Sequence, residues 1–172
     1  MAIKEILIHP DPKLREPARP VTDPTAPEIR QLARDMADTM YDAPGVGLAA
    51  PQIGVSLRVV VTDTEWRNEG AERDLKVWIN PEFIWKSDET EIFEEGCLSL
   101  PEVYEEVERP AAVRLRWQDL EGNTHEADFN GFQAVALQHE FDHLDGKLFI
   151  DYLSPLKRKL ITKKLKKRFK GG

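Results

Sequence analysis

The chain has 172 residues, of which 41% are hydrophobic and 32% are charged, the composition of one domain that buries its own core. Its mean hydropathy of −0.49 and the lack of any apolar run near the ~18 residues that cross a bilayer exclude a transmembrane protein. The N-terminus resembles neither a signal peptide nor a transit peptide, so we expect a cytoplasmic protein. The single cysteine, Cys97, excludes a disulfide within the chain.

The net charge of −7 is unevenly distributed along the chain. Residues 157–170 hold nine of the 24 Lys and Arg residues and no acid, whereas residues 1–156 carry all 31 acids and a net charge of −16. Clustered cations neutralise phosphates whatever the base sequence. The basic segment is therefore able to attract nucleic acid, while the acidic body is not.

Six prolines between Pro10 and Pro27 predict an extended, turn-rich lead-in on the surface. From Pro27 the apolar residues recur at helical spacing until Pro44 and Gly45, so we predict the first helix there. The β-type runs that follow lie at residues 57–62, 76–79, 112–117 and 124–129, with Ile92 and Phe93 in a further β-type stretch. Residues 121–123 predict a hairpin turn between the last two runs.

The strongest helical pattern after the first covers residues 131–145. Asn130 and Gln133 are spaced as a capping box, and Gly146 stands where a C-terminal cap is expected. Apolar residues on two faces are typical of a helix at the centre of a domain. We therefore predict one α+β domain over residues 1–172, with mainly antiparallel β-sheets around this central helix, an N-terminal helix and a basic C-terminal helix at 157–170.

The central helix contains His139-Glu140-Phe141-Asp142-His143, an H-E-x-x-H sequence. Residues four apart on a helix point the same way, so both imidazoles can bind one metal ion. Glu140 lies about 100° around the helix from His139, where it can meet a water molecule at the metal without being a ligand. The alternative is two histidines that are satisfied by ordinary hydrogen bonds.

A catalytic metal site needs three protein ligands and one open position. No histidine follows His143 in the chain, and Asp145 and Asp151 lie close after the end of the helix. Cys97 is therefore the leading candidate for the third ligand, and Gly96 before it permits a close approach of the backbone. The alternative for a lone cysteine is a small buried apolar residue.

A third stretch, Gly45-Val46-Gly47-Leu48-Ala49-Ala50-Pro51-Gln52, is dense in small residues that let a ligand or another chain come close. Gln52 offers both a hydrogen-bond donor and an acceptor. Alone, such a stretch is more often only a turn, and its spacing matches neither phosphate-binding glycine motif.

Taken together and in this order, the three stretches resemble the peptide deformylase family. Members of that family carry G-x-G-L-A-A-P/T-Q, E-G-C-L-S and Q-H-E-x-D-H, which residues 45–52, 95–99 and 138–143 match. Residues 9–15 and 151–156 extend the resemblance over essentially the whole chain, and the length is similar to that of the compact bacterial type. Many members have an Arg where this chain has Tyr104, so Tyr104 or Arg109 is expected to hold Glu95 instead.

The resemblance implies a hydrolase that removes the formyl group from the N-terminal formylmethionine of newly synthesised proteins and releases formate. It implies a metal held by Cys97, His139 and His143, with Glu140 as the base that takes a proton from the attacking water. The Gln52 amide and the backbone N–H of Leu98 are expected to stabilise charge on the formyl oxygen. Fe²⁺ is implied as the ion, with Zn²⁺, Ni²⁺ or Co²⁺ as substitutes, because ligand spacing does not choose among them.

The resemblance also implies that the peptide lies as an added strand beside the first motif. The methionine side chain is expected in an apolar pocket that includes the ring of His139. The residues expected to bind substrate are Val46, Gly47, Phe93, Glu95, Gly96, Phe132, Val135 and Ala136. Plain core packing is the alternative for the apolar members of this set.

The expected partners are N-formylmethionyl nascent peptides and, through the basic helix 157–170, the ribosome; no membrane and no specific DNA is expected. Leu156, Leu160, Ile161, Leu165 and Phe169 give this helix intermittent apolar contacts. A solvated basic helix packed on an acidic body is the alternative.

Two other functions compete. A zinc endopeptidase rests on the H-E-x-x-H sequence alone, and a non-catalytic, ribosome-associated metal-binding module also explains the ligands and the basic segment. Glu140 disfavours the second, because a structural site has no use for an adjacent base.

Overall fold

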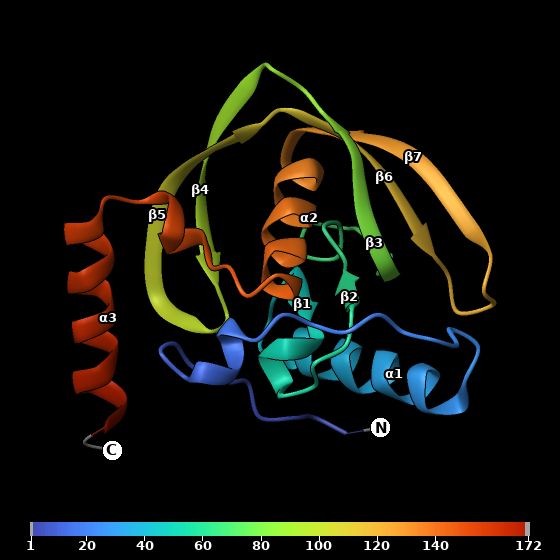
Figure 1. Ribbon diagram of the computed structural model, residues 1–172, viewed down its shortest axis with the longest axis horizontal. Helices are drawn as coiled ribbons and strands as arrows, with labels where there is room; N and C mark the ends of the chain where they lie inside the picture. Colours follow the sequence, from blue (N-terminus) through green and yellow to red (C-terminus); the bar gives the residue numbers. More distant parts are fainter. Residues whose placement is uncertain (1, 171–172) are drawn as a thin grey trace.

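The computed structural model describes residues 2–170, with side chains through residue 168. Figure 1 shows helix α2 (Gly131–Leu144) at the centre with the strands arched around it, α1 (Pro27–Asp42) beneath, and α3 (Pro155–Lys170) outermost, beside β5. All three predicted helices are present, and the α+β class is confirmed. None of the described helices has the length and hydropathy to cross a membrane.

The strands of the described residues form two antiparallel sheets. The larger sheet has the order β1-β2-β3-β6-β7, and the smaller one is the hairpin β4-β5. The strands are β1 (Gly47–Ala49), β2 (Val59–Thr62), β3 (Lys76–Lys86), β4 (Thr90–Cys97), β5 (Leu100–Pro110), β6 (Ala112–Gln118) and β7 (Thr124–Asn130). Since β1 and β4 each have a neighbour on one side only, both leave a backbone edge available for pairing.

Three strands differ from the expectation, since β1 and β5 were not predicted and β3 is longer than predicted. β3 continues to Lys86 instead of ending at Ile79, because a register shift and a left-handed φ of +50° at Asn80 carry the strand past Pro81. β5 is absent from the expectation because its charged residues obscure the alternation. Its buried Val103 and Val107 belong to a small core that is shared with α3.

The two ends of α2 are capped in different ways. The expected capping box is wrong, because the Asn130 side chain makes no cap hydrogen bond and Gly131, at φ +62°, turns the chain directly from β7 into α2. The expected C-terminal cap is confirmed. Gly146 has a φ of +75°, and its N–H donates to the carbonyl of His143.

Helix α2 is the centre of the molecule. Every residue from 134 to 144 is buried, so the expectation of a central helix is confirmed. Leu137 and Phe141 pack with Trp78 of β3 against the larger sheet. Met36 and Met40 of α1 pack on β2 from below and complete a second core. The face of α2 that is turned toward β1 and β4 carries the polar residues described next.

The two terminal segments lie on the outside. The lead-in has only the short helix η1 (Pro12–Arg15) and a single bridge between Arg19 and Leu57. In α3, Leu165 is buried against β5 and the short helix η3 (Phe149–Tyr152), whereas Leu156 and Leu160 are exposed. The expected contact of Phe169 lies outside the described side chains. The short helix η2 (Ala50–Ile53) follows β1.

Candidate active site and metal centre

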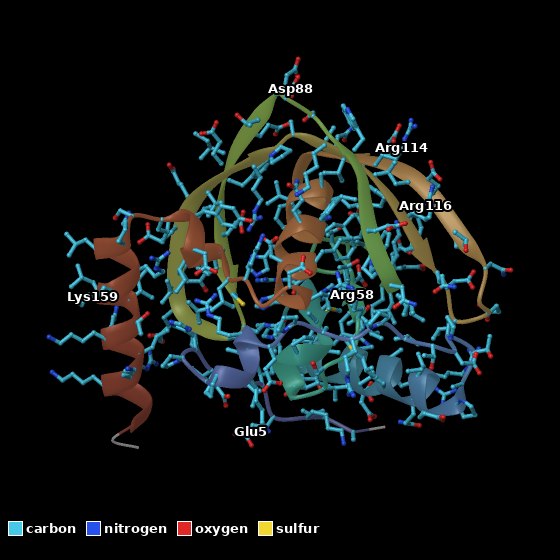
Figure 2. All side chains as sticks on the ribbon, in the orientation of Figure 1. Glu5, Arg58, Asp88, Arg114, Arg116 and Lys159 are labelled. Atoms are coloured by element: carbon cyan, nitrogen blue, oxygen red, sulfur yellow. The ribbon has the colours of Figure 1, made fainter. Side chains whose placement is uncertain are left out.

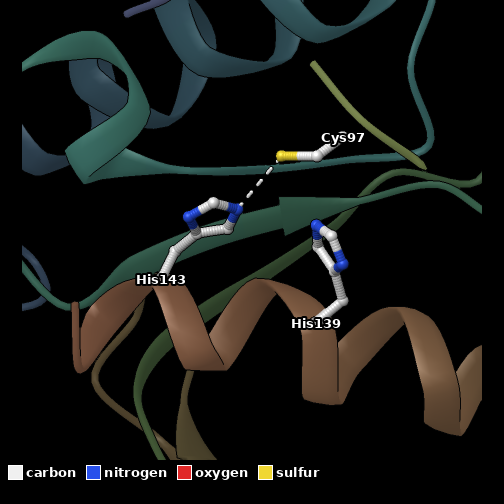
Figure 3. Close-up of side chains that lie close together, drawn as sticks. All are labelled: Cys97, His139 and His143. Atoms are coloured by element: carbon white, nitrogen blue, oxygen red, sulfur yellow. Dashed lines mark hydrogen bonds between the residues drawn. The ribbon is translucent and has the colours of Figure 1, made fainter. Parts of the chain in front are cut away.

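The three predicted metal ligands meet at one point. His139 and His143 rise from successive turns of α2, and Cys97, at the end of β4, faces them (Figure 3). One ligand atom from each residue lies within 4.8 Å of the other two. Cys97 Sγ lies 3.4 Å from His143 Nε2. The helix sets the spacing of the histidines, and β4 supplies the thiol from a distant part of the chain.

The donor set fits a divalent transition metal, because one sulfur and two imidazole nitrogens suit Fe²⁺ or Zn²⁺. His143 is fully buried, and its Nδ1 has no hydrogen-bond partner among the described residues. Burial, followed by the nearby charge of His139, lowers the pKa of His143 well below its ordinary value. The imidazole therefore stays neutral, which is the form that binds a metal.

His139 is oriented by Glu95. Its Nδ1 lies 3.0 Å from Glu95 Oε1, so Nε2 is left to face the cysteine. Burial alone lowers the pKa of His139, but Glu140, then Cys97 and Glu95, outweigh it and raise the pKa well above its ordinary value in the metal-free chain.

Arg109, and not Tyr104, holds Glu95. The guanidinium donates to both carboxylate oxygens of Glu95, at 2.6 and 2.9 Å, and to Asp142 at 2.9 Å. The hydroxyl of Tyr152 donates to the same Asp142 oxygen at 2.8 Å. Burial alone raises the pKa of Glu95, but the hydrogen bonds from His139 and Arg109 outweigh it and hold the pKa below its usual value. Glu95 therefore stays ionised beside the ligand that it orients.

Glu140 has the surroundings of a general base. Its Oε1 is buried with no hydrogen-bond partner in the described chain, and its Oε2 lies 4.0 Å from His139 Nε2. A Cβ atom at Gly47 would lie 2.7 Å from Oε2, so only glycine leaves room for this carboxylate. Burial raises the pKa of Glu140 to about 7 in the metal-free chain. Such a group can accept and release a proton near neutral pH.

Gln52 and Leu98 lie beside the thiol, as predicted. Gln52 Oε1 accepts the N–H of Ala49, while its Nε2 donates to Ser99 at 3.1 Å and points at Cys97 Sγ at 3.5 Å. Leu98 follows Cys97 directly and lines the same cleft. The side-chain amide of Gln52 is thus held with its donor toward the metal centre.

The centre opens into a cleft of about 670 Å³ between the β1 segment and β4. Of the residues expected to bind substrate, the cleft is lined by Val46, Gly47, Glu95, Gly96, Phe132, Val135 and Ala136. Phe93 is not among its lining residues; its ring packs 6.3 Å from that of Phe132. The Glu95 carboxylate is engaged by Arg109 and His139, so its backbone is what remains for a peptide.

Three other residues at the site have positions that the sequence does not predict. Arg67, from the loop 63–75, and Tyr104, from β5, also line the cleft, and Asp142 supports Arg109 from within α2. The sequence of the loop 63–75 has no recognisable secondary-structure pattern. Its position depends on contacts with residues that are distant in the chain, such as Gly45. Asp142 stands inside the H-E-x-x-H sequence, three residues after His139 and one before His143, and helical spacing alone does not show that its carboxylate turns toward Arg109.

Comparison of the sequence with known protein families agrees with the arrangement of this site. A model of the polypeptide deformylase family matches residues 3–159. A peptide deformylase of Bradyrhizobium sp. (strain BTAi1) is 56% identical over 172 residues, covering 99% of this chain and 98% of the relative. One of Rhodopseudomonas palustris (strain BisB5) is 51% identical, covering 100% of this chain and 98% of the relative.

Solved structures agree. The crystal structure of a peptide deformylase from Legionella pneumophila is 46% identical, with a TM-score of 0.88 over 97% of this chain and 95% of that one. The peptide deformylase from Ehrlichia chaffeensis in complex with actinonin is 36% identical, with a TM-score of 0.92 over 98% of this chain and 99% of that one. The chain belongs to the polypeptide deformylase family.

Proposed function

We propose that the chain is a metal-dependent peptide deformylase that hydrolyses the formyl group of N-terminal formylmethionine and releases formate. One observation carries the proposal: a buried carboxylate, Glu140, stands beside the candidate metal ligands Cys97, His139 and His143 in a cleft that is lined in part by apolar residues. We also propose that residues 1–172 act as one catalytic domain, with 157–170 as its basic helix.

The residues of the chain divide the work of the reaction. Cys97, His139 and His143 would hold the ion, which when bound supplies Lewis-acid polarisation and an acidified water. Glu140 takes the proton of the attacking water and later delivers it to the departing amine. The Gln52 amide and the backbone N–H of Leu98 stabilise negative charge on the formyl oxygen. We propose Fe²⁺ as the physiological ion, with Zn²⁺, Ni²⁺ and Co²⁺ as substitutes, since the donor set suits all of them.

The peptide is proposed to pair with the free edge of the β1 segment. β1 is an edge strand, and Val46 and Gly47, at its start, line the cleft. The methionine side chain then enters the space between Val46, Phe132 and Val135, where apolar walls favour an apolar chain. We place this activity in the cytoplasm, where formylated nascent chains are made.

We further propose that α3 contacts the ribosome. Lys157 pairs with Glu105 at 2.8 Å and Arg168 pairs with Glu102, so one side of the helix docks on β5. Another side carries a basic groove of about 580 Å³, lined by Arg15, Pro155, Arg158, Lys159, Thr162, Lys163 and Lys166. Figure 2 shows the Lys159 side chain directed away from the body. A groove with this many cations and no acid suits RNA phosphates.

An anaerobic assay of formate release tests the proposed activity. Purified protein with measured metal content is incubated with a formyl-Met tripeptide, its acetyl-Met counterpart and an unformylated internal peptide. Formate release from the first peptide, with the other two left intact, is expected. Cleavage of internal peptide bonds instead would show a zinc endopeptidase, and metal binding without any hydrolysis would show a binding module.

A further inference from the structure

The loop 63–75, between β2 and β3, is held in shape by its first residue. Asp63 is buried, and its carboxylate accepts the backbone N–H groups of Glu65, Trp66 and Asp74 at 3.0, 3.1 and 2.7 Å. The hydroxyl of Tyr41 donates a fourth hydrogen bond at 2.6 Å. Because one carboxylate joins both ends of the loop to α1, the loop has a defined position instead of moving as a free connection.

The same loop is attached to the wall of the cleft. Trp66 Nε1 donates to the carbonyl of Gly45 at 2.9 Å, and the N–H of Asp63 donates to the carbonyl of Val46 at 2.8 Å. The Arg73 guanidinium lies 4.0 Å from the centre of the Tyr41 ring and braces the loop from behind. Gly45 and Val46 belong to the segment beside which the peptide is proposed to lie.

These contacts hold the backbone of Arg67, the neighbour of Trp66, beside the cleft. Within the segment, Gly47 faces Glu140 at the reacting end, whereas Gly45 carries the hydrogen bond from Trp66. Arg67, next to Trp66, is exposed and lines the cleft, and it makes no hydrogen bond or ion pair with any residue that the structure describes. It is the sole Lys or Arg among the described residues that line the cleft.

We propose that Arg67 forms a subsite for an acidic side chain of the substrate, downstream of the formylated methionine. This inference rests on the proposed deformylase function and adds a substrate preference to it. A guanidinium with no partner of its own binds a carboxylate through two parallel N–H groups, which favours Glu or Asp over an uncharged residue of the same shape.

The opposite wall limits the preference to certain positions. Glu94 and Glu102 line the other side of the cleft, and Glu102 already pairs with Arg168. Successive side chains of an extended peptide point to opposite sides. A side chain directed at the loop therefore meets Arg67, whereas its neighbour meets Glu94, so an acid is favoured at alternate positions only.

The test compares matched peptides. The substrates are formyl-Met-Ala-Ala-Ala-amide and its variants with Glu, Gln or Lys at the second, third or fourth position. The C-terminal amide removes the terminal carboxylate as a competing ligand. The enzymes are the wild type, Arg67→Gln, Arg67→Glu and the control Arg34→Gln, which removes one exposed cation from α1 that does not line the cleft.

The wild type is expected to prefer Glu over Gln in kcat/KM at one or more positions by up to about fivefold, the range of a solvent-exposed ion pair, mainly through KM and less so at high salt. Arg67→Gln abolishes this preference, Arg67→Glu reverses it toward Lys, and Arg34→Gln retains it. Equal Glu-to-Gln ratios in the wild type and Arg67→Gln contradict the subsite while deformylation of the all-alanine peptide stands. A wild type that leaves the all-alanine peptide intact contradicts the proposed function, and the subsite with it.

Discussion

The two oxygens of Glu95 receive both arms of Arg109, at 2.6 and 2.9 Å, and one of them also contacts Nδ1 of His139 at 3.0 Å. A single buried carboxylate thus connects β5 to a proposed metal ligand on α2. The pairing neutralises charge inside the protein and also chooses which nitrogen of His139 is left for the metal.

Arg109→Met is expected to destabilise the fold and weaken the metal site. It leaves the carboxylates of Glu95 and Asp142 buried without their cation, which costs about 3–5 kcal/mol in the free energy of unfolding. Metal affinity should fall about 10–100-fold, since His139 loses its oriented support. Urea unfolding and chelator competition measure the two effects. Arg114→Met, which breaks an exposed pair with Asp128, is the control and should change both quantities far less.

Glu140→Ala is expected to keep the fold and the metal but to lose formate release by at least ~10²-fold, because a positioned acid–base group contributes that much. Glu140 is not one of the three proposed metal ligands, and its buried Oε1 has no hydrogen-bond partner among the described residues. The metal content of the variant should therefore match that of the wild type. Activity is measured at saturating metal. A variant with near-wild-type turnover would refute the assigned role.

Cys97 is expected to act as a ligand and not as a nucleophile. Cys97→Ser should bind metal more weakly, by at least about tenfold, because a hydroxyl ionises less readily and is a harder donor than a thiol. Mass spectrometry of the wild type during turnover should show no formyl adduct on the thiol. A trapped formyl-cysteine contradicts this assignment, as does unchanged metal affinity in the serine variant.

His9 is expected to make stability depend on pH. It is buried, with Nε2 2.8 Å from Thr162 Oγ1 on α3. Burial, followed by the charge of Arg15, lowers its pKa from 6.5 to about 4. Because the unfolded chain takes up this proton first, its contribution is intact above pH 6.5 and declines as the pH falls toward 4.

The expected loss is about 1–2 kcal/mol, since the ring keeps some contact with water. His9→Gln retains a hydrogen-bonding group of similar reach but does not titrate. The difference between wild type and variant in the free energy of unfolding should therefore change between pH 7 and pH 4. A constant difference across this window rules out His9 as the cause.

The basic groove is expected to bind ribosomes without taking part in hydrolysis. Truncating α3 would remove Leu165, which is buried in a core near Cys97, so substitution is the cleaner test. Lys159, Lys163 and Lys166 line the groove, and replacing all three by Gln should weaken co-sedimentation with ribosomes at low salt by about tenfold or more. Hydrolysis of short peptides should stay within twofold of the wild type. Equal ribosome binding across a salt titration leaves only a solvated basic helix.

Much of the centre follows from local sequence. The pair His139 and His143 with Glu140 between them is set by helical periodicity, which depends only on residues within two turns of each other. The first helix after Pro27 and the cap at Gly146 are local in the same sense, and the structure has both. The sequence predicts Cys97 as the third ligand for two reasons: no histidine follows His143 in the chain, and the motif around Cys97 resembles that of the family.

Other features needed the tertiary structure, since they join residues far apart in the chain. Arg109, from β5, reaches Glu95 and Asp142 only because the β4-β5 hairpin folds over α2, and Tyr104 is an equally good candidate on sequence. The continuation of β3 past Pro81 depends on a bulge against β6. The placing of Arg67 on the cleft depends on Asp63 and on the contact of Trp66 with Gly45, 21 residues away in the chain. Local sequence patterns do not predict such distant contacts, because these contacts form only after the core has brought the segments together.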